Sequence, residues 1–575
     1  MALKFIKKFN LLLLTLAMVV TTVMASSNTL TYEVLGVDNH QAKNNIAQRL
    51  NIMKNSYGNI PSTDDIQAFY EEAPSNIEQA LQPFGYFKPT IHHKLQHHNS
   101  NWLAQFHIQQ GPPLIITTLD IQITGQGYNN AELLEKLKAL PLKQGQRFSS
   151  QNYANAQTML FNAAQNLGYL DARFTTHEIK INLAQYRATV ILHFDTGNRY
   201  YFGDVTFNES PYSQKLLHRF VNFKAGDPYD PQKIQTLQTD LSNSKYFSSV
   251  IINPKIDNAK HQYVPIKIDT TPAKSQQYNF GLGFGTNTGF RTSIGANFNR
   301  LTASGQHLSL LTNLSQVNTG LSAKYYFPGS EPARNQYFIG STIQTFDQHS
   351  GDSEAFSIAG SGGYETTINQ IYHSSLSMNV LHERFEIDDD PTQTVNVFYP
   401  SWTMTRLSLD DSLSPTRGTS ISLMTRGGGS SSSMTFAQAE LTAKWLYPVT
   451  RNAFVILRGQ VGTTTTNNYD KFPLTLRYFA GGINSVRGYG YQDLGPGKYL
   501  RVGSVELQHR LRGNLYGAIF YDIGNATDEW DDALEQSAGV GLVYRSPIGP
   551  IEAYLARPLE DTNAIRFEFS IGAGL

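Results

Sequence analysis

The chain has 575 residues, and its 46 basic and 46 acidic side chains leave no charge excess that would attract nucleic acid. Charged residues make up 16% of the sequence against a usual share of about 25%, while aromatic residues reach 12%. No apolar run after the N-terminus approaches the roughly 18 residues of a spanning helix, which excludes a helical membrane protein. The lack of Cys excludes thiol catalysis, Cys-ligated metal and disulfides.

The first 25 residues have the pattern of an export signal. Lys4, Lys7 and Lys8 form a positive start, residues 9–23 are apolar, and small residues precede a predicted cleavage after Ala25. An uncleaved anchor is the alternative, but the apolar run is short for a membrane span. We therefore predict a signal peptide at residues 1–25 and a mature chain in an exported compartment.

Glycine divides the mature chain into two parts. Eleven of the 45 glycines lie in residues 1–273, which leaves 34 in residues 274–575. The glycine-poor part repeats one motif, a tyrosine directly after a helical stretch, at residues 85–91, 168–174 and 245–251. In the first two copies a glycine opens the motif, because glycine accepts the left-handed conformation that ends a helix.

The second repeat shows the order of its elements most clearly. A β-rich run at residues 115–124 precedes helical patterns at 130–140 and 149–167. Alternating strands follow at 173–181 and 187–194. Each repeat is thus predicted as strand, helix, helix, strand, strand, an α+β unit.

The C-terminal part consists of amphipathic strands. Residues 564–575 alternate strictly between apolar and polar or glycine positions. Residues 538–542 alternate with glycine, and in residues 519–524 Ile519, Tyr521 and Ile523 alternate with Phe520, Asp522 and Gly524. Such dyads, separated by turns, are typical of transmembrane barrels, and about 300 residues accommodate roughly 12 to 18 strands. A soluble β-sandwich is the alternative, but such domains usually end near ~100 residues.

Several motifs carry a resemblance to a known family. The sequence Val486-Arg487-Gly488-Tyr489 closely resembles the Val-Arg-Gly-Tyr loop of the outer-membrane protein assembly and two-partner secretion superfamily. Three further motifs match the same superfamily. Its Phe-x-Asp-x-Gly strand is similar to residues 520–526, its late Pro-x-Gly-Pro hairpin to residues 540–551, and its Pro-Thr-Arg-Gly turn to residues 413–418. The N-terminal repeats resemble its POTRA domains.

The resemblance implies a fold and a location. It implies three POTRA-like βααββ domains in the periplasm, followed by a 16-stranded transmembrane β-barrel in the Gram-negative outer membrane. The expected bounds are residues 26–111, 112–196 and 197–272 for the repeats and 273–575 for the barrel.

Three repeats and a Gly-x-x-Leu ending most resemble the TamA branch of the superfamily, because BamA-like factors carry five repeats and two-partner transporters two. This branch implies assembly of β-barrel or autotransporter-like clients, without a cofactor or an enzymatic reaction. The implied partners are an inner-membrane-anchored TamB-like protein, unfolded outer-membrane protein clients and outer-membrane lipid. Two positions depart from the superfamily, since Glu552-Ala553-Tyr554 replaces an Arg-Leu/Phe-Asp strand and Leu575 replaces a terminal aromatic residue.

Arg487 needs partners if its loop folds into the barrel, because an unpaired charge is costly where water is scarce. Glu506 and Asp522 lie on the two following strands in the phase that faces inward. We predict that they pair with the guanidinium, and in the family this contact is thought to hold the barrel's conformation. The alternative is an arginine in a solvated surface loop.

The first and last strands of a barrel must pair to close it, and here both are rich in glycine, which weakens a strand interior. The resulting weak seam resembles the superfamily's lateral gate, which offers an edge to an incoming strand. No helix follows the first glycine cluster, which argues against a nucleotide loop. The predicted gate residues are Gly281, Gly283, Gly285, Phe567, Phe569, Gly572, Gly574 and Leu575.

Signals for an enzyme or a metal site are weak. His382-Glu383 begins like a zinc-protease motif but lacks the second histidine. A histidine group (His92, His93, His97 and His98) and residues 388–390 are better explained as solvated loops or turns than as metal ligands. Two alternative functions stay open: a two-partner secretion pore that exports one client, and an outer-membrane hydrolase or passive porin.

Overall fold

The computed structural model describes residues 28–58, 61–286, 288–348, 353–387, 390–411, 415–429, 432–547, 549–560 and 564–572. The predicted signal peptide, Gly574 and Leu575 lie outside this set. Among the described residues, no helix is both long and apolar enough to cross a membrane. The chain forms two compact units that divide inside the third repeat. The first holds the described residues up to Gly203 together with 225–232 and 256–264, and the second holds the rest.

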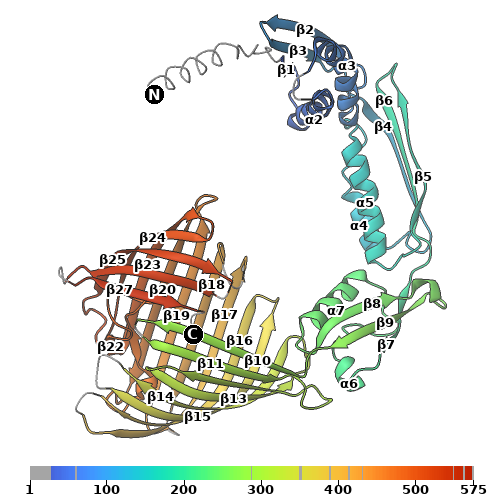
Figure 1. Cartoon of the computed structure of the whole chain (residues 1–575). Helices are drawn as coiled ribbons and strands as arrows, with labels where there is room; N and C mark the ends of the chain where they lie inside the picture. The colour runs from blue at the N-terminus through green and yellow to red at the C-terminus, as the bar shows by residue number, and fades with distance from the viewer. Residues whose placement is uncertain are drawn as a thin grey trace, which may run out of the picture. The chain divides into compact units, whose positions relative to one another are not determined.

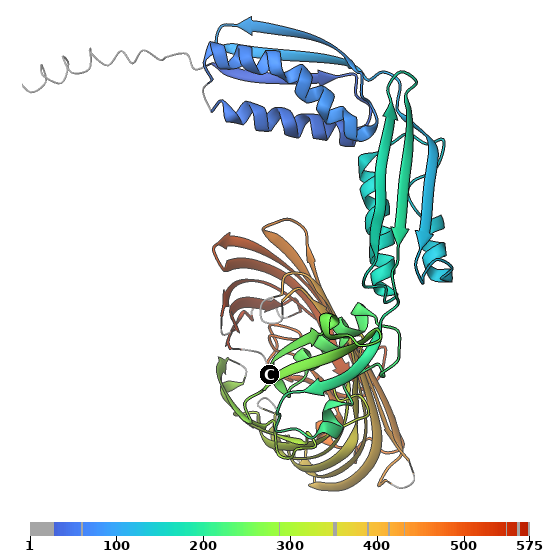
Figure 2. The same cartoon turned by 90° about the vertical axis from the view of Figure 1, so that its right-hand side faces the viewer.

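The first repeat is a three-stranded sheet with two helices on one face (Figure 2). The strand order is β1-β3-β2, with β1 parallel and β2 antiparallel to β3. Ile46, Phe69 and Phe106 are fully buried between the sheet and the helices. The elements are β1 (Thr29–Leu35), α2 (His40–Ser56), α3 (Thr63–Leu81), η1 (Gln82–Phe84), β2 (Thr90–His98) and β3 (Asn101–Gln109).

The second repeat has the same construction, with strand order β4-β6-β5 and helices along one face of the sheet (Figure 1). Every element lies within two residues of its predicted range. Gly168 ends the longer helix region at φ +87°, and a Cβ there would lie 2.8 Å from the Tyr229 carbonyl oxygen, so glycine is required. The elements are β4 (Ile115–Thr124), α4 (Ala131–Lys138), α5 (Ser150–Asn166), β5 (Arg173–Asn182) and β6 (Arg187–Asp195).

The third repeat again pairs its strands as β7-β9-β8. Within the second unit it contacts the barrel turns: the Ser213 N–H donates to the Ala303 carbonyl at 2.8 Å, and the Tyr246 hydroxyl donates to the Gly305 carbonyl at 3.1 Å. The elements are β7 (Tyr201–Phe207), α6 (Gln214–Leu217), α7 (Pro231–Asn243), β8 (Phe247–Pro254), η2 (Ile256–Asn258) and β9 (Tyr263–Pro272).

Within the described residues, sixteen strands follow one another around a closed antiparallel barrel (Figure 1). The predicted fold class, three βααββ repeats followed by a barrel, is thereby confirmed. The strands are β10 (Gln276–Gly285), β11 (Gly289–Phe298), β12 (His307–Leu314), β13 (Asn318–Pro328), β14 (Asn335–Asp347), β15 (Glu354–Ile368), β16 (Tyr372–Glu386), β17 (Gln393–Leu409), β18 (Gly418–Gly428), β19 (Phe436–Pro448), β20 (Ala453–Thr466), β23 (Tyr499–Arg512), β24 (Leu515–Thr527), β25 (Glu535–Ser546), β26 (Gly549–Pro558) and β27 (Arg566–Ile571).

The barrel strands carry apolar residues outward and polar residues inward, as the alternation predicts. Val540 and Phe567 are each 54% exposed on the outer surface, whereas Asp522 and Glu568 are fully buried on the inner side. The interior is therefore a polar environment in which charged side chains need partners.

Candidate functional site

A long loop, residues 467–498, joins β20 to β23 and contains η3 (Leu474–Leu476), β21 (Tyr478–Ala480) and β22 (Leu494–Gly497). We call it the lid loop. Gly481 and Gly482 both have positive φ, at +102° and +91°. A Cβ on Gly481 would lie 2.3 Å from the Gly490 carbonyl oxygen. These glycines therefore shape a tight turn that presents the following motif.

The structure brings Arg487 together with both carboxylates named from the sequence. Its guanidinium donates to Asp522 in a fork, from Nε to Oδ2 at 2.7 Å and from Nη2 to Oδ1 at 2.8 Å. Nη1 donates to Glu506 Oε2. Arg487 is fully buried, with its Cζ 3.5 Å from the ring centre of Phe520 and 4.7 Å from that of Tyr554.

These carboxylates decide the charge state of the arginine. Burial lowers the pKa of the Arg487 guanidinium, but the hydrogen bonds and charges of Asp522 and Glu506 outweigh burial and raise that pKa above its usual range. The backbone N–H of Arg487 also donates to Asp522 Oδ2, at 3.1 Å. One carboxylate therefore binds both the side chain and the main chain of the loop.

The other motif residues also contact the barrel wall. Val486 is fully buried against the inner side of the barrel. The Gly488 N–H donates to Glu568 Oε1 at 2.8 Å, and the Tyr489 hydroxyl donates to Glu535 Oε2 at 2.5 Å. The motif thus binds the last strand as well as β23, β24 and β25.

A second attachment of the lid loop was missed from the sequence. Glu383 of β16 is fully buried and accepts from the Thr475 N–H at 3.2 Å and from the Thr475 hydroxyl. The carbonyl of Leu476 accepts from Gln438 at 2.9 Å and from Arg426 at 3.1 Å. The only signal in the sequence was an acidic residue in the inward phase of an amphipathic strand, and that signal does not identify its partner.

The seam between the first and last strands is short. Within the described residues, β10 and β27 pair at Phe284↔Ile571 and Gly285↔Ser570, whereas β26 and β27 share six pairs and β10 and β11 share ten. The Thr286 N–H adds a hydrogen bond to the Phe569 carbonyl at 3.0 Å. Among the residues that the structure describes, which end at Gly572, no pair joins Gln276–Gly283 of β10 to β27.

The inward side chains of β27 supply further contacts. Ser570 accepts from Arg291 Nη2 at 3.3 Å, and Glu568 accepts from Gly488 of the lid loop. Arg566 lies 3.9 Å from Asp493 of the same loop. The last strand is thus held from the lumen as well as along its edge.

The glycines of the seam leave space for other groups. A Cβ on Gly281 would lie 2.3 Å from the Ser293 hydroxyl, and a Cβ on Gly283 would lie 2.9 Å from the Ile571 carbonyl oxygen. Gly285 forms one of the two seam pairs. Gly572 follows the last strand with φ +102°. The sequence predicted these glycines as gate residues because glycine weakens a strand interior. In the structure, the missing side chains of Gly281 and Gly283 also let atoms of neighbouring strands come close to the backbone.

The two phenylalanines of the gate set lie on the outward phase of β27. Phe567 is exposed, and the Phe569 ring centre lies 6.3 Å from that of Phe284 across the seam.

Among the described residues, no group of three or more His, Asp or Glu side chains could hold a metal ion. The four histidines that the sequence offered as weak metal-site candidates lie on β2. Of the acidic candidates at 388–390, Asp388 and Asp389 lie outside the described residues.

Comparison with known proteins places these features in a family. A model of the Omp85 superfamily domain matches residues 217–574. A model of TamA POTRA domain 1 matches residues 31–110, and a POTRA model, described as a surface antigen variable number repeat, matches residues 117–197.

Two curated relatives are outer membrane protein assembly factors named BamA. The one from Nitratidesulfovibrio vulgaris is 24% identical over 62% of this chain and 49% of its own length. The one from Neisseria meningitidis serogroup B is 19% identical over 77% of this chain and 65% of its own length. The chain thus spans about half of one relative's length and about two thirds of the other's.

The crystal structure of Haemophilus ducreyi BamA lacking POTRA domains 1–3 has a similar fold. It has a TM-score of 0.64 and 17% sequence identity, and the match covers 80% of this chain and 99% of that one.

Proposed function

Because the chain belongs to the Omp85 superfamily, we propose that it is an assembly factor of the TamA type, which inserts β-barrel or autotransporter-like clients into the outer membrane. It is an outer-membrane β-barrel protein with POTRA domains. The match of the first repeat to a TamA POTRA model supports the TamA type.

The observation that carries this proposal is the short seam. No described residue of β27 pairs with Gln276–Gly283, and a strand edge of this kind can accept main-chain hydrogen bonds from another extended chain. Counted over the described residues, opening this seam breaks two pairs, whereas opening β26 from β27 breaks six. Strand exchange is therefore easiest where the first and last strands meet.

The proposed work is an exchange of strand pairing and needs no covalent chemistry and no cofactor. The lid loop would hold the closed state through Arg487, Glu506 and Asp522. A TamB-like protein anchored in the inner membrane is the proposed partner, with unfolded outer-membrane proteins as clients and outer-membrane lipid around the barrel. The test of this partner is co-purification with the full chain: recovery of a TamB-like protein would support it.

A reversible lock of the seam tests the mechanism. The chain has no Cys, so Phe284→Cys with Ile571→Cys adds the sole thiols, and paired Cα atoms lie within the ~7 Å that a disulfide needs. A urea-unfolded autotransporter β-domain is offered to the protein in lipid vesicles, and its assembly is read from heat-dependent gel migration. We expect assembly to stop in the oxidised protein and to return with reductant.

Two control pairs make the result specific. Val540→Cys with Leu555→Cys locks β25 to β26 and leaves the seam free, so assembly should continue. Phe280→Cys with Ile571→Cys should not oxidise, because Phe280 lies outside the paired segment. Assembly at the wild-type rate by a fully oxidised seam lock refutes strand exchange and favours a two-partner secretion pore, which exports its client through the lumen.

A further inference from the structure

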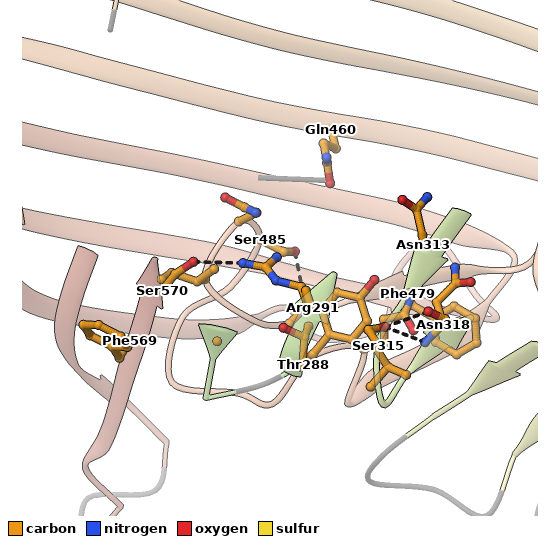
Figure 3. A pocket seen from close by; sticks show the side chains of 17 residues that line it. Thr288, Arg291, Asn313, Ser315, Asn318, Gln460, Phe479, Ser485, Phe569 and Ser570 are labelled. Carbon is orange, nitrogen blue, oxygen red and sulfur yellow. Dashed lines mark hydrogen bonds between the residues drawn. The ribbon is translucent and has the colours of Figure 1, made fainter. Parts of the chain in front are cut away.

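A cavity with both polar and apolar lining residues lies on the lumen side of the seam, beside β10, β11, β27 and the lid loop. Its volume is about 320 Å³, which is room for several waters. Figure 3 shows the side chains that line it, with Arg291 pointing toward Ser570. Arg291 is the charged residue of this lining, and no carboxylate of the described residues forms an ion pair with it.

Arg291 reaches the last strand by crossing the first. It lies on β11 directly opposite Gly283 of β10, and a Cβ on Gly283 would lie 3.5 Å from the Arg291 Nε. Its Nη2 then donates to Ser570, which is paired with Gly285. Because Gly283 has no side chain, the guanidinium can contact the lumen-facing side chain of whichever strand lies beside β10.

The present contact is weak for an arginine. A serine hydroxyl at 3.3 Å is a neutral acceptor near the long end of hydrogen-bond distances. A carboxylate would form a charge-assisted bond, which is roughly twice as strong as a neutral one, and it could accept in bidentate geometry. The cavity beside Ser570 has room for a longer side chain.

The rest of the lining also suits a polar group. Asn313 Oδ1 and Gln492 Oε1 are buried acceptors without a partner among the described residues, and both residues line the cavity. Gln492 is also held at φ +62°, a conformation that few residues other than glycine adopt. Unpartnered buried amides are costly, so a polar occupant is favoured over an apolar one.

We propose that Arg291 selects clients by charge: it favours an extended strand that carries Asp or Glu at the lumen-facing position opposite Gly285. This inference rests on the proposed strand exchange. In the resting protein Ser570 occupies that position, and a client with a carboxylate displaces it because its bond to Arg291 is stronger. Arg291 is thus a specificity-determining residue of the seam.

The first test places the carboxylate in the chain itself. The redox equilibrium of the Phe284→Cys/Ile571→Cys pair in glutathione buffers gives the effective concentration of the two thiols, which reports the closed seam. Adding Ser570→Asp should raise this value about tenfold relative to Ser570→Asn, the neutral isostere. In an Arg291→Gln background the two should be equal. An equal gain with and without Arg291 overturns the proposal.

The second test uses peptides as probes. Nonapeptides with the sequence of residues 564–572, blocked at both ends, carry Ser, Asn or Asp at the position of Ser570, and fluorescence anisotropy measures their binding to the full chain in detergent. We expect the Asp peptide to bind about tenfold more tightly than the Asn peptide. Arg291→Gln should remove this preference, while Arg406→Gln, at another barrel arginine, should retain it.

The two tests separate this inference from the function on which it rests. If the thiol pair responds to Ser570→Asp but no peptide binds, strand exchange is refuted and client selection with it. If the peptides bind but Arg291→Gln leaves their order unchanged, strand exchange stands and the role of Arg291 is refuted.

Discussion

Glu568, on the last strand of the barrel, accepts a hydrogen bond at 2.8 Å from the backbone N–H of Gly488, the residue that follows the buried arginine of the lid loop. The loop therefore connects the wall formed by β23 and β24 with the strand that closes the seam. Since the described part of β27 shares two pairs with β10, we expect this contact from the lumen to help hold the seam closed. Release of the loop and opening of the seam are thus expected to be coupled.

Substitution of Glu568 tests this coupling. Glu568→Ala removes the acceptor of the Gly488 N–H, whereas Glu568→Gln keeps an acceptor oxygen in the same place. We expect faster backbone hydrogen exchange over residues 566–571 in the Ala variant and near-normal protection in the Gln variant. Equal protection of both variants and the wild type would show that the loop does not hold β27.

Arg487 is expected to be essential for the position of the loop rather than for folding of the barrel. Arg487→Ala leaves Asp522 buried without its arginine, while Glu506 keeps its ion pair with Arg458, and removal of one partner from a buried pair costs about 3–5 kcal/mol. Arg487→Lys should also fail, because an ammonium cannot reproduce the fork to Asp522 together with the bond to Glu506.

Limited proteolysis measures this effect. Both variants should be cleaved within residues 481–493 while heat-dependent gel migration shows an intact barrel. Arg406→Lys, at another arginine of the barrel wall, is the control and should stay resistant. Protease resistance of Arg487→Ala equal to that of the wild type contradicts the anchoring role.

The attachment through Glu383 should govern the open area of the lumen. Glu383→Gln retains one acceptor oxygen for the two donors of Thr475, its N–H and its hydroxyl. A buried donor without an acceptor costs about 1–3 kcal/mol. We expect a higher and noisier single-channel current in planar bilayers as the first half of the lid loop loosens. His382→Gln, at the exposed neighbouring position, should leave the current unchanged. An unaltered current in Glu383→Gln removes this residue from the loop's attachment.

Gly283 should tolerate a side chain less well than Gly360, another glycine of the barrel. A Cβ at this position would lie 2.9 Å from the Ile571 carbonyl oxygen, so Gly283→Ala must displace the last strand. Overpacking of this kind typically costs about 1–3 kcal/mol. Gly360→Ala is the matched control, because no atom lies within 4 Å of the Cβ built there.

The Phe284→Cys/Ile571→Cys equilibrium is the measurement for this pair of variants. We expect less disulfide at a given redox potential in Gly283→Ala and no change in Gly360→Ala. More disulfide in Gly283→Ala would mean that the glycine weakens the seam by its backbone freedom alone.

Local patterns in the sequence determined much of the fold. The elements of the second repeat agree with prediction within two residues, because helix period, strand alternation and helix-ending glycine depend on neighbours in the chain. The same alternation placed Glu506 and Asp522 on the inner wall, where an arginine in an inward loop must find carboxylates. Charge and burial together made those three residues predictable as a group.

Only the tertiary structure decided which strand pairs are short and which side chains meet across the lumen. Alternation assigns a residue to a face, but the stagger between strands is independent of it, so the two-pair seam could not be counted from the sequence. Glu383 meets Thr475 across 92 residues, and Arg291 meets Ser570 across 279. Such contacts form only when the barrel closes. The contact of Arg291 with Ser570 also requires that Gly283, which lies between them, has no side chain.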